Sequence, residues 1–160
     1  MAKPPRDAAT WDSRTYFLTA RTWQGRALFQ AQRTATLFLD VLYEYRAQAK
    51  FQLHEFVVMP NHVHLMITPG PDVTLERAMQ LIKGGFSHRA GQELGRMEIW
   101  QRGYVDHRIR DAQDYARHRR YIHMNPVRAR LVDAPGEFPF SSAVGQFELD
   151  PAPQGLKPPE

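Results

Sequence analysis

Two strand-like runs near the middle of the chain are separated by only two residues, and this spacing constrains the fold more than any other feature. Phe51 to Met59 and His62 to Thr68 are rich in apolar residues, and Pro60-Asn61 lies between them. A connection this short is typical of a β-hairpin, because parallel strands need a long crossover. The spacing therefore predicts an antiparallel sheet that contains this hairpin.

Segments on either side of the hairpin complete the pattern of one fold class. Residues 15–23 read as a strand, and apolar positions three and four apart predict a helix over residues 31–50. Thr74 is placed to cap a second helix, residues 99–109 look extended, and Asp111 is placed to cap a last helix. The order β-α-β-β-α-β-α predicts an α+β fold, ferredoxin-like (RRM-like). Helices would cover one face of its antiparallel sheet and leave the other for a ligand.

Length and composition predict a single folded domain. The chain has 160 residues, 42% of them hydrophobic, and it has no cysteine, which excludes disulfides and cysteine-ligated metal sites. Proline-rich ends predict flexible tails at residues 1–13 and 147–160 around a domain at 14–146. No segment has the apolar length of a signal peptide or a membrane span, so we expect a soluble, cytoplasmic protein.

Arginine supplies most of the positive charge and is concentrated in one region. Of the 21 cationic residues 17 are arginine, and nine of these lie in residues 96–130 beside only four acidic residues. A guanidinium group binds phosphate through two parallel hydrogen bonds. This concentration of arginines therefore indicates that the protein binds a nucleic-acid backbone. A solvated helix face is the alternative interpretation.

Two histidines alternate with apolar residues directly after the hairpin turn. Because alternate residues of a strand share a face, His62 and His64 point the same way while Val63 and Leu65 point into the core. Two adjacent imidazoles form half of a metal site, and solvated histidines are the alternative. Neutral imidazole accepts several divalent ions, so the pair alone does not select the metal.

The last helix carries a tyrosine and an asparagine four residues apart. This spacing places Tyr121 and Asn125 on one face, one turn from each other, where a nucleophile and a metal ligand could meet. The alternative is structural, since Asn125-Pro126 is an ordinary helix boundary and Tyr121 could be a packed aromatic residue.

Five short strings occur in the order found in one known family. They are Tyr16 to Thr22, Val57 to Leu65, Asp106 to Asp111, Tyr121 to Val127 and Phe138 to Ser142. Together, over residues 14–146, they resemble the single-tyrosine HUH transposases, and most closely the branch of REP-associated tyrosine transposases. One departure concerns Arg130, which stands where family members usually have glycine and leaves the path of residues 130–146 open.

The resemblance implies a metal-dependent DNA transesterase, an endonuclease and strand transferase for single-stranded DNA. His62, His64 and Asn125 would hold Mg²⁺ or Mn²⁺, and Tyr121 would form a 5′-phosphotyrosine link. The expected substrate carries a REP-like hairpin and is cut beside it. A monomer is favoured, although related enzymes exchange the tyrosine helix across a dimer.

Cations near this site become candidates for binding the DNA backbone, and Trp100 or Tyr104 for stacking on an unpaired base. The candidate cations are Lys83, Arg102, Arg108, Arg110, Arg117, Arg119 and Arg120. His107 is either structural or a DNA contact. The histidines predicted to be non-ligands are His54, His88, His118 and His123.

Two other functions are compatible with the same residues. One is a ferredoxin-like nucleic-acid-binding regulator that no longer cuts, which the intact Tyr121, His62 and His64 argue against. The other is a metal-dependent hydrolase that uses water, for which Tyr121 would be dispensable.

Overall fold

A single antiparallel sheet organises the computed structural model, which describes residues 14–156 and 158; the predicted tail at residues 1–13 lies outside this part. The strands are β1 (Tyr16–Arg21), β2 (Phe51–Met59), β3 (His62–Pro69) and β4 (Val105–Arg108). Their spatial order is β2-β3-β1-β4, with every neighbouring pair antiparallel. This order confirms the predicted ferredoxin-like, α+β fold.

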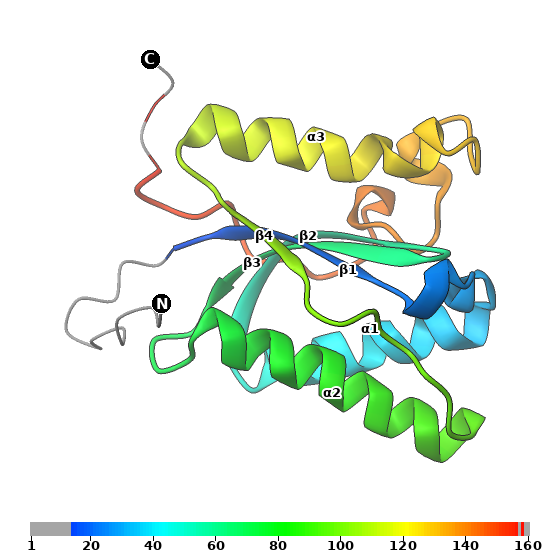
Figure 1. The fold of residues 1–160 in the computed structure, drawn as a ribbon. Coiled ribbons are helices and arrows are strands. Elements are labelled where there is room, and N and C mark those ends of the chain that lie inside the picture. The colour runs from blue at the N-terminus through cyan, green and yellow to red at the C-terminus, as the bar shows by residue number, and fades with distance from the viewer. Residues whose placement is uncertain (1–13, 157, 159–160) are drawn as a thin grey trace.

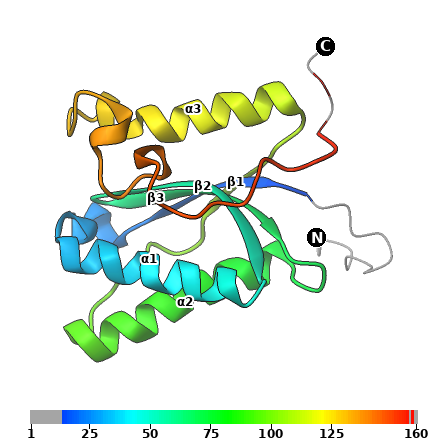
Figure 2. The same ribbon diagram turned by 180° about the vertical axis from the view of Figure 1, so that it is seen from behind.

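Helices occupy both faces of the sheet. Figures 1 and 2 show α1 (Gln32–Ala47) and α2 (Leu75–Leu94) on one face and α3 (Ala112–Arg128) on the other. The side chains of Thr74 and Asp111 accept hydrogen bonds from backbone N–H groups in the first turns of α2 and α3, as predicted. No candidate for crossing a membrane occurs among the helices of the described residues.

Each face of the sheet has its own apolar core. Val58, Val63 and Leu65 belong to the main core, on the side of α1 and α2. Val57 and Met66 belong to a second, smaller core, which includes Ile122 of α3. The face predicted to be left for a ligand is therefore partly covered by α3, because that helix has an apolar stripe of its own.

Helix α3 passes through a proline. It continues to Arg128 with Pro126 inside it, so Asn125 is a helical residue and shares a helix face with Tyr121, whereas the alternative of a helix boundary at Asn125-Pro126 is wrong. Arg130, two residues after the helix, adopts a left-handed conformation with φ 61°. Arg130 thus adopts a backbone conformation that glycine adopts readily, and its Cβ makes this conformation strained.

A bulge in β2 directs two consecutive side chains toward α3. The pairing with β3 shifts between Leu53 and Glu55, which leaves His54 as the extra residue. His54 lies against Tyr115 of α3, and Glu55 forms a hydrogen-bonded ion pair with His123 of the same helix. The bulge therefore supplies two of the contacts that hold α3 in place.

The C-terminal segment follows the outer edge of β2 (Figure 2). Val58 N donates to Phe140 O at 2.8 Å, and Asp150 N donates to Leu53 O at 2.8 Å. Residues 147–156 therefore differ from the predicted flexible tail. Two apolar side chains, Phe147 and Leu149, pack against the main core, and Asp150 accepts hydrogen bonds from Arg46 at 3.0 and 3.1 Å.

Candidate active site

The two histidines of β3 lie side by side on the face that α3 covers. The centroids of the His62 and His64 rings are 4.7 Å apart. β1 is the neighbouring strand, and its register places Thr19 opposite His64 and Arg21 opposite His62. The predicted alternation is therefore present, with the imidazoles on one face and Val63 in the main core.

His64 is a buried imidazole with one unused nitrogen. Its Nδ1 lies 2.9 Å from Thr19 Oγ1, whereas Nε2 has no hydrogen-bond partner among the described residues. Burial, together with the charge of Arg21 and the charge that His62 carries when protonated, lowers the pKa of His64 to about 3. The ring is thus neutral at physiological pH, and in the tautomer whose Nδ1–H donates to Thr19 Oγ1 a lone pair remains on Nε2.

His62 is held from two sides. Its Nδ1 donates to Asn61 Oδ1 at 2.7 Å. Burial and the charge of Arg21 lower its pKa, and a hydrogen bond with the side chain of Asn125 opposes them. Asn125 of α3, the predicted third ligand, therefore contacts this histidine.

Tyr121 lies beside the same pair. The centroid of its ring is 5.3 Å from that of His64 and 5.9 Å from that of Phe17, which also stacks on His64 at 5.1 Å. Tyr121 is 40% exposed, so a substrate can reach it. One chain thus brings together all four residues predicted from β3 and the last helix.

The nitrogen and oxygen atoms of His62, His64 and Asn125 suit a divalent cation as ligands. His64 offers an unused Nε2 in a buried position, and His62 and Asn125 are in contact next to it. Nitrogen and oxygen ligands of this kind fit several divalent ions. An unpaired buried imidazole nitrogen costs free energy, which binding of a cation would recover.

A second cluster joins β4 to the start of α3. His107, Asp114 and His118 lie close enough to share a metal ion, although His118 was predicted to be a non-ligand. His107 Nε2 donates to Asp114 Oδ2 at 2.8 Å, and His118 Nδ1 donates to Asp114 O at 2.8 Å. Both nitrogens carry the proton that a metal would have to displace, so the cluster is primarily a hydrogen-bonded brace.

Asp114 is the centre of this brace. Burial raises the pKa of its carboxyl, but hydrogen bonds from His107 and from the backbone of Arg110 outweigh burial and keep the pKa below its ordinary value. Its Oδ1 has no hydrogen bond within the described residues and lies 3.2 Å from His118 Nδ1. His107 therefore has a clear structural role, which the sequence left open.

The predicted DNA-binding cations fall into two groups. Arg117 and Arg120 are exposed on α3, as are Arg102 and Arg108 near β4. The other group comprises Lys83, Arg110 and Arg119, which form hydrogen bonds or ion pairs with protein groups, and Arg108 of the first group also interacts within the protein.

Lys83 stabilises a loop. Its ammonium donates to Gln101 O at 3.2 Å and to Gly103 O at 2.6 Å. Trp100 packs against the main core and donates from Nε1 to Lys83 O at 3.0 Å, so it is not free to stack on a base.

Two residues near the histidines were not predicted from the sequence. Thr19 contacts His64, and Arg21 acts electrostatically on both histidines. Both are on β1, and only the register between β1 and β3 reveals them. The other predicted non-ligands have different surroundings: His54 and His123 are hydrogen-bonded to protein groups, and His88 is exposed on α2.

Comparisons with known proteins show which family and which fold the chain is similar to. The family described as transposase IS200-like matches residues 12–125, a range that includes β3 and extends to Asn125. The REP-associated tyrosine transposase of Escherichia coli (strain K12) is 29% identical over 152 residues, covering 91% of this chain and 87% of that protein. A solved structure of a REP-associated tyrosine transposase bound to a REP hairpin is similar with a TM-score of 0.71 and 26% identity. That match covers 96% of this chain and 93% of the other.

Proposed function

Because this chain belongs to the IS200-like transposase family, we propose that it cuts and rejoins single-stranded DNA beside a REP-like hairpin, with Tyr121 as nucleophile. The observation that carries the proposal is the meeting of Tyr121 with His62, His64 and Asn125 in one chain. An exposed phenol beside a buried imidazole with an unused nitrogen suits a nucleophile next to a metal ligand.

His62, His64 and Asn125 would hold a divalent cation, Mg²⁺ or Mn²⁺. When bound, such an ion polarises a non-bridging oxygen of the phosphate and offsets the charge that develops in the transition state. The low pKa of His64 means that this ligand is already deprotonated at neutral pH.

Tyr121 carries the covalent step. A phenol ordinarily has a pKa of about 10, so its hydroxyl must lose its proton as it attacks phosphorus. A bond forms between the tyrosine oxygen and phosphorus, the bond from phosphorus to the 3′ oxygen breaks, and that oxygen takes up a proton to leave as a 3′-hydroxyl. The resulting 5′-phosphotyrosine retains the phosphodiester energy, and attack by a DNA 3′-hydroxyl reverses the step.

Neighbouring side chains orient the nucleophile and bind the strand. Phe17 lies between His64, His118 and Tyr121, and so limits the positions that the tyrosine ring can take. The exposed arginines of α3, Arg117 and Arg120, would contact the DNA backbone. Arg102 and Arg108 are further candidates at the edge of the sheet, and Arg110 and Arg119 are partly occupied by Asp114 and Glu55.

Covalent capture tests the proposal. The protein is incubated with hairpin oligonucleotides and Mg²⁺ or Mn²⁺, and a denaturing gel reveals any protein–DNA adduct. We expect an adduct that is absent in Tyr121→Phe and in His64→Ala but present in Tyr115→Phe, a matched control on the same helix. Binding without an adduct would favour a regulator, and cleavage by Tyr121→Phe would favour a hydrolase.

A further inference from the structure

A hollow lies between the end of β1 and the segment that leads into β4. It is lined by Thr19, Arg21 and residues 101–105 and has a volume of about 220 Å³. The strand register connects it to the candidate active site, because Val105 is opposite Thr19 and Thr19 is opposite His64. The hollow is therefore one strand away from the histidine with the unused nitrogen.

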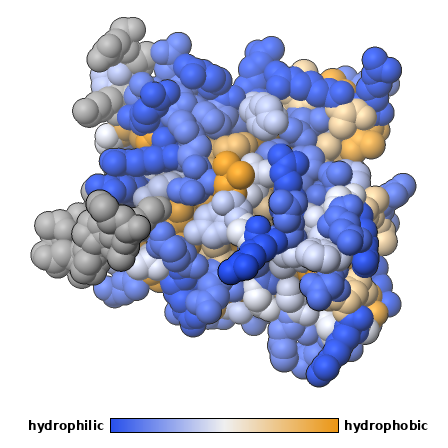
Figure 3. Space-filling view, in the orientation of Figure 1, coloured by the Kyte–Doolittle hydropathy of each residue, from blue (hydrophilic) through white to orange (hydrophobic). Residues whose placement is uncertain are grey.

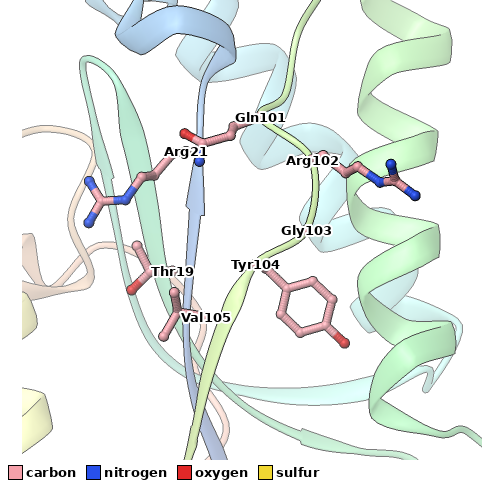
Figure 4. A pocket seen from close by; sticks show the side chains of 7 residues that line it. All are labelled: Thr19, Arg21, Gln101, Arg102, Gly103, Tyr104 and Val105. Carbon is pink, nitrogen blue, oxygen red and sulfur yellow. The ribbon is translucent and has the colours of Figure 1, made fainter.

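The lining of the hollow includes one exposed apolar side chain. Val105 is 61% exposed, and Figure 4 shows its side chain next to that of Thr19. In Figure 3 a small apolar area interrupts a largely hydrophilic surface where β4 runs. An exposed apolar side chain beside a charged rim suits a flat ring that has an apolar face and a neighbouring negative charge.

Arginine supplies the charge at the rim. Figure 4 shows Arg21 on the same side of the strands as Thr19 and Val105, whereas the side chains of Arg102 and Tyr104 point to the other side, toward α2. Arg21 is exposed and lies opposite His62. A phosphate between the hollow and the histidines would thus meet a guanidinium group.

The wall of the hollow is fixed before any ligand arrives. Lys83 donates to two carbonyls of the wall, Gln101 O and Gly103 O, and Gln101 N donates to Arg21 O at 2.8 Å. Gly103 has φ 79°, a conformation that glycine adopts without strain. A preformed site loses less entropy when it binds.

We propose that this hollow is a subsite for one unpaired nucleobase of the DNA strand, next to the phosphate that Tyr121 attacks. The base lies on Val105 and Thr19, and Arg21 binds its phosphate. Pockets for drug-sized ligands occupy roughly 300–1,000 Å³, so a hollow of this smaller size suits a single base. The inference rests on the proposed function.

Abasic scanning tests the subsite. Fluorescence anisotropy measures binding of hairpin oligonucleotides in which a single abasic site is moved through the unpaired nucleotides, using Tyr121→Phe to prevent attachment. We expect one position where loss of the base weakens binding roughly five- to tenfold. With Val105→Ser added, binding of the complete strand falls by a similar factor, and the abasic site at that position has little further effect.

The control is Met97→Ser, which changes another exposed apolar residue, 39% exposed and outside the hollow. In this background the abasic effect should remain at its full size. Arg21→Gln should weaken complete and abasic strands alike and reduce the salt dependence of binding by about one phosphate contact.

The outcomes separate the two proposals. Equal abasic effects in the Val105→Ser and Met97→Ser backgrounds at every position would overturn the subsite. If the wild-type protein still forms its tyrosine adduct in that case, the proposed function stands without the subsite. A protein that binds no single-stranded DNA would overturn both.

Discussion

Arg130 is a residue whose backbone conformation costs stability. Its φ of 61° lies in the left-handed region, where a Cβ is strained by roughly 1–2 kcal/mol and glycine is not. We expect Arg130→Gly to raise the free energy of unfolding by about 1 kcal/mol, because it removes this strain. The gain is smaller than the full strain, since glycine increases the conformational entropy of the unfolded chain. Urea denaturation followed by circular dichroism measures the change.

The neighbouring residue provides the control for this substitution. Ala129 has φ −79°, an ordinary conformation, so Ala129→Gly should lower the free energy of unfolding by roughly 0.5–1 kcal/mol. If both glycine variants lose stability, strain at Arg130 is refuted.

His54 makes stability depend on pH. It is buried, its Nδ1 donates to Pro151 O at 2.9 Å, and burial lowers its pKa below the ordinary 6.5. The folded pKa is thus below the unfolded one, so the stabilisation is complete above the unfolded pKa and is lost as pH falls toward the folded pKa. In metal-free buffer we expect the free energy of unfolding to decrease as the pH is lowered from 6.5.

The variant His54→Gln isolates this contribution, since the histidines of β3 titrate in both proteins. A series of urea denaturations across the acid range should give a shallower decline for the variant than for the wild type. Identical slopes would show that His54 does not contribute.

Single residues were predictable where one element decides their position. Alternation along β3 places His62 with His64, and helical spacing places Tyr121 with Asn125, so both pairs follow from local geometry. Arg21 was not predictable, because its place opposite His62 depends on the register between two strands that are distant in sequence. The role of Lys83 depends in the same way on the position of a loop.

At the scale of elements, several contacts fix α3 to the sheet. Ile122 enters the second core, the Asp114 brace ties the start of the helix to β4, and His123 pairs with Glu55 of β2. Ser142 also donates to Glu55, at 3.0 Å. Because α3 carries Tyr121, these contacts determine where the proposed nucleophile lies.

Removing the charge of Glu55 should loosen this helix. Glu55→Gln weakens the hydrogen bonds from His123 and Ser142, and we expect it to lower the free energy of unfolding by roughly 1–3 kcal/mol. The rate of adduct formation at saturating DNA should fall several-fold while DNA affinity changes little. Urea denaturation and a time course of the adduct measure the two effects.

A surface carboxylate serves for comparison. Glu44 pairs with Arg89 at 3.0 Å on the exposed sides of α1 and α2, where an ion pair contributes under about 1 kcal/mol. Glu44→Gln should leave the adduct rate unchanged. A similar loss of rate in both variants would mean that Glu55 does not position the helix.

Two features of the elements could not be predicted from the sequence: the bulge in β2 and the path of the C-terminal segment. A single extra residue such as His54 leaves no mark in an apolar run, so the sequence could not show that Glu55 faces α3. Prolines after residue 150 suggest disorder, whereas two apolar side chains and the pairing of Asp150 with Arg46 hold the preceding residues in place.

At the scale of the whole molecule, the candidate site is built within one chain. Tyr121 of α3 lies beside His64 of β3 in the same molecule. We therefore expect a mixture of Tyr121→Phe and His64→Ala to form no adduct, because neither chain contains a complete site. The assay is the same denaturing gel.

A mixture of wild type with Tyr121→Phe checks that the variants do not inhibit each other, and should give adduct in proportion to the wild type present. Adduct from the two inactive variants together would show that α3 is exchanged between chains, and would contradict a site in one chain.

The ferredoxin-like order was predictable because each segment has its own pattern, from the hairpin at Pro60-Asn61 to the caps at Thr74 and Asp111. The position of α3 was not, since an amphipathic helix can pack on either face or on another copy. The second core around Ile122 decides this question, and its members come from four separate parts of the chain.

The edges of the sheet bear on how the protein behaves when concentrated. The outer side of β2 is engaged by the C-terminal segment, and β4, at the other edge, has only four residues, among them Asp106 and Arg108. A long, uncovered, apolar edge strand acts as a template for the next molecule and leads to fibrils or precipitate. With one edge occupied and the other short and charged, the folded protein resists this route to aggregation.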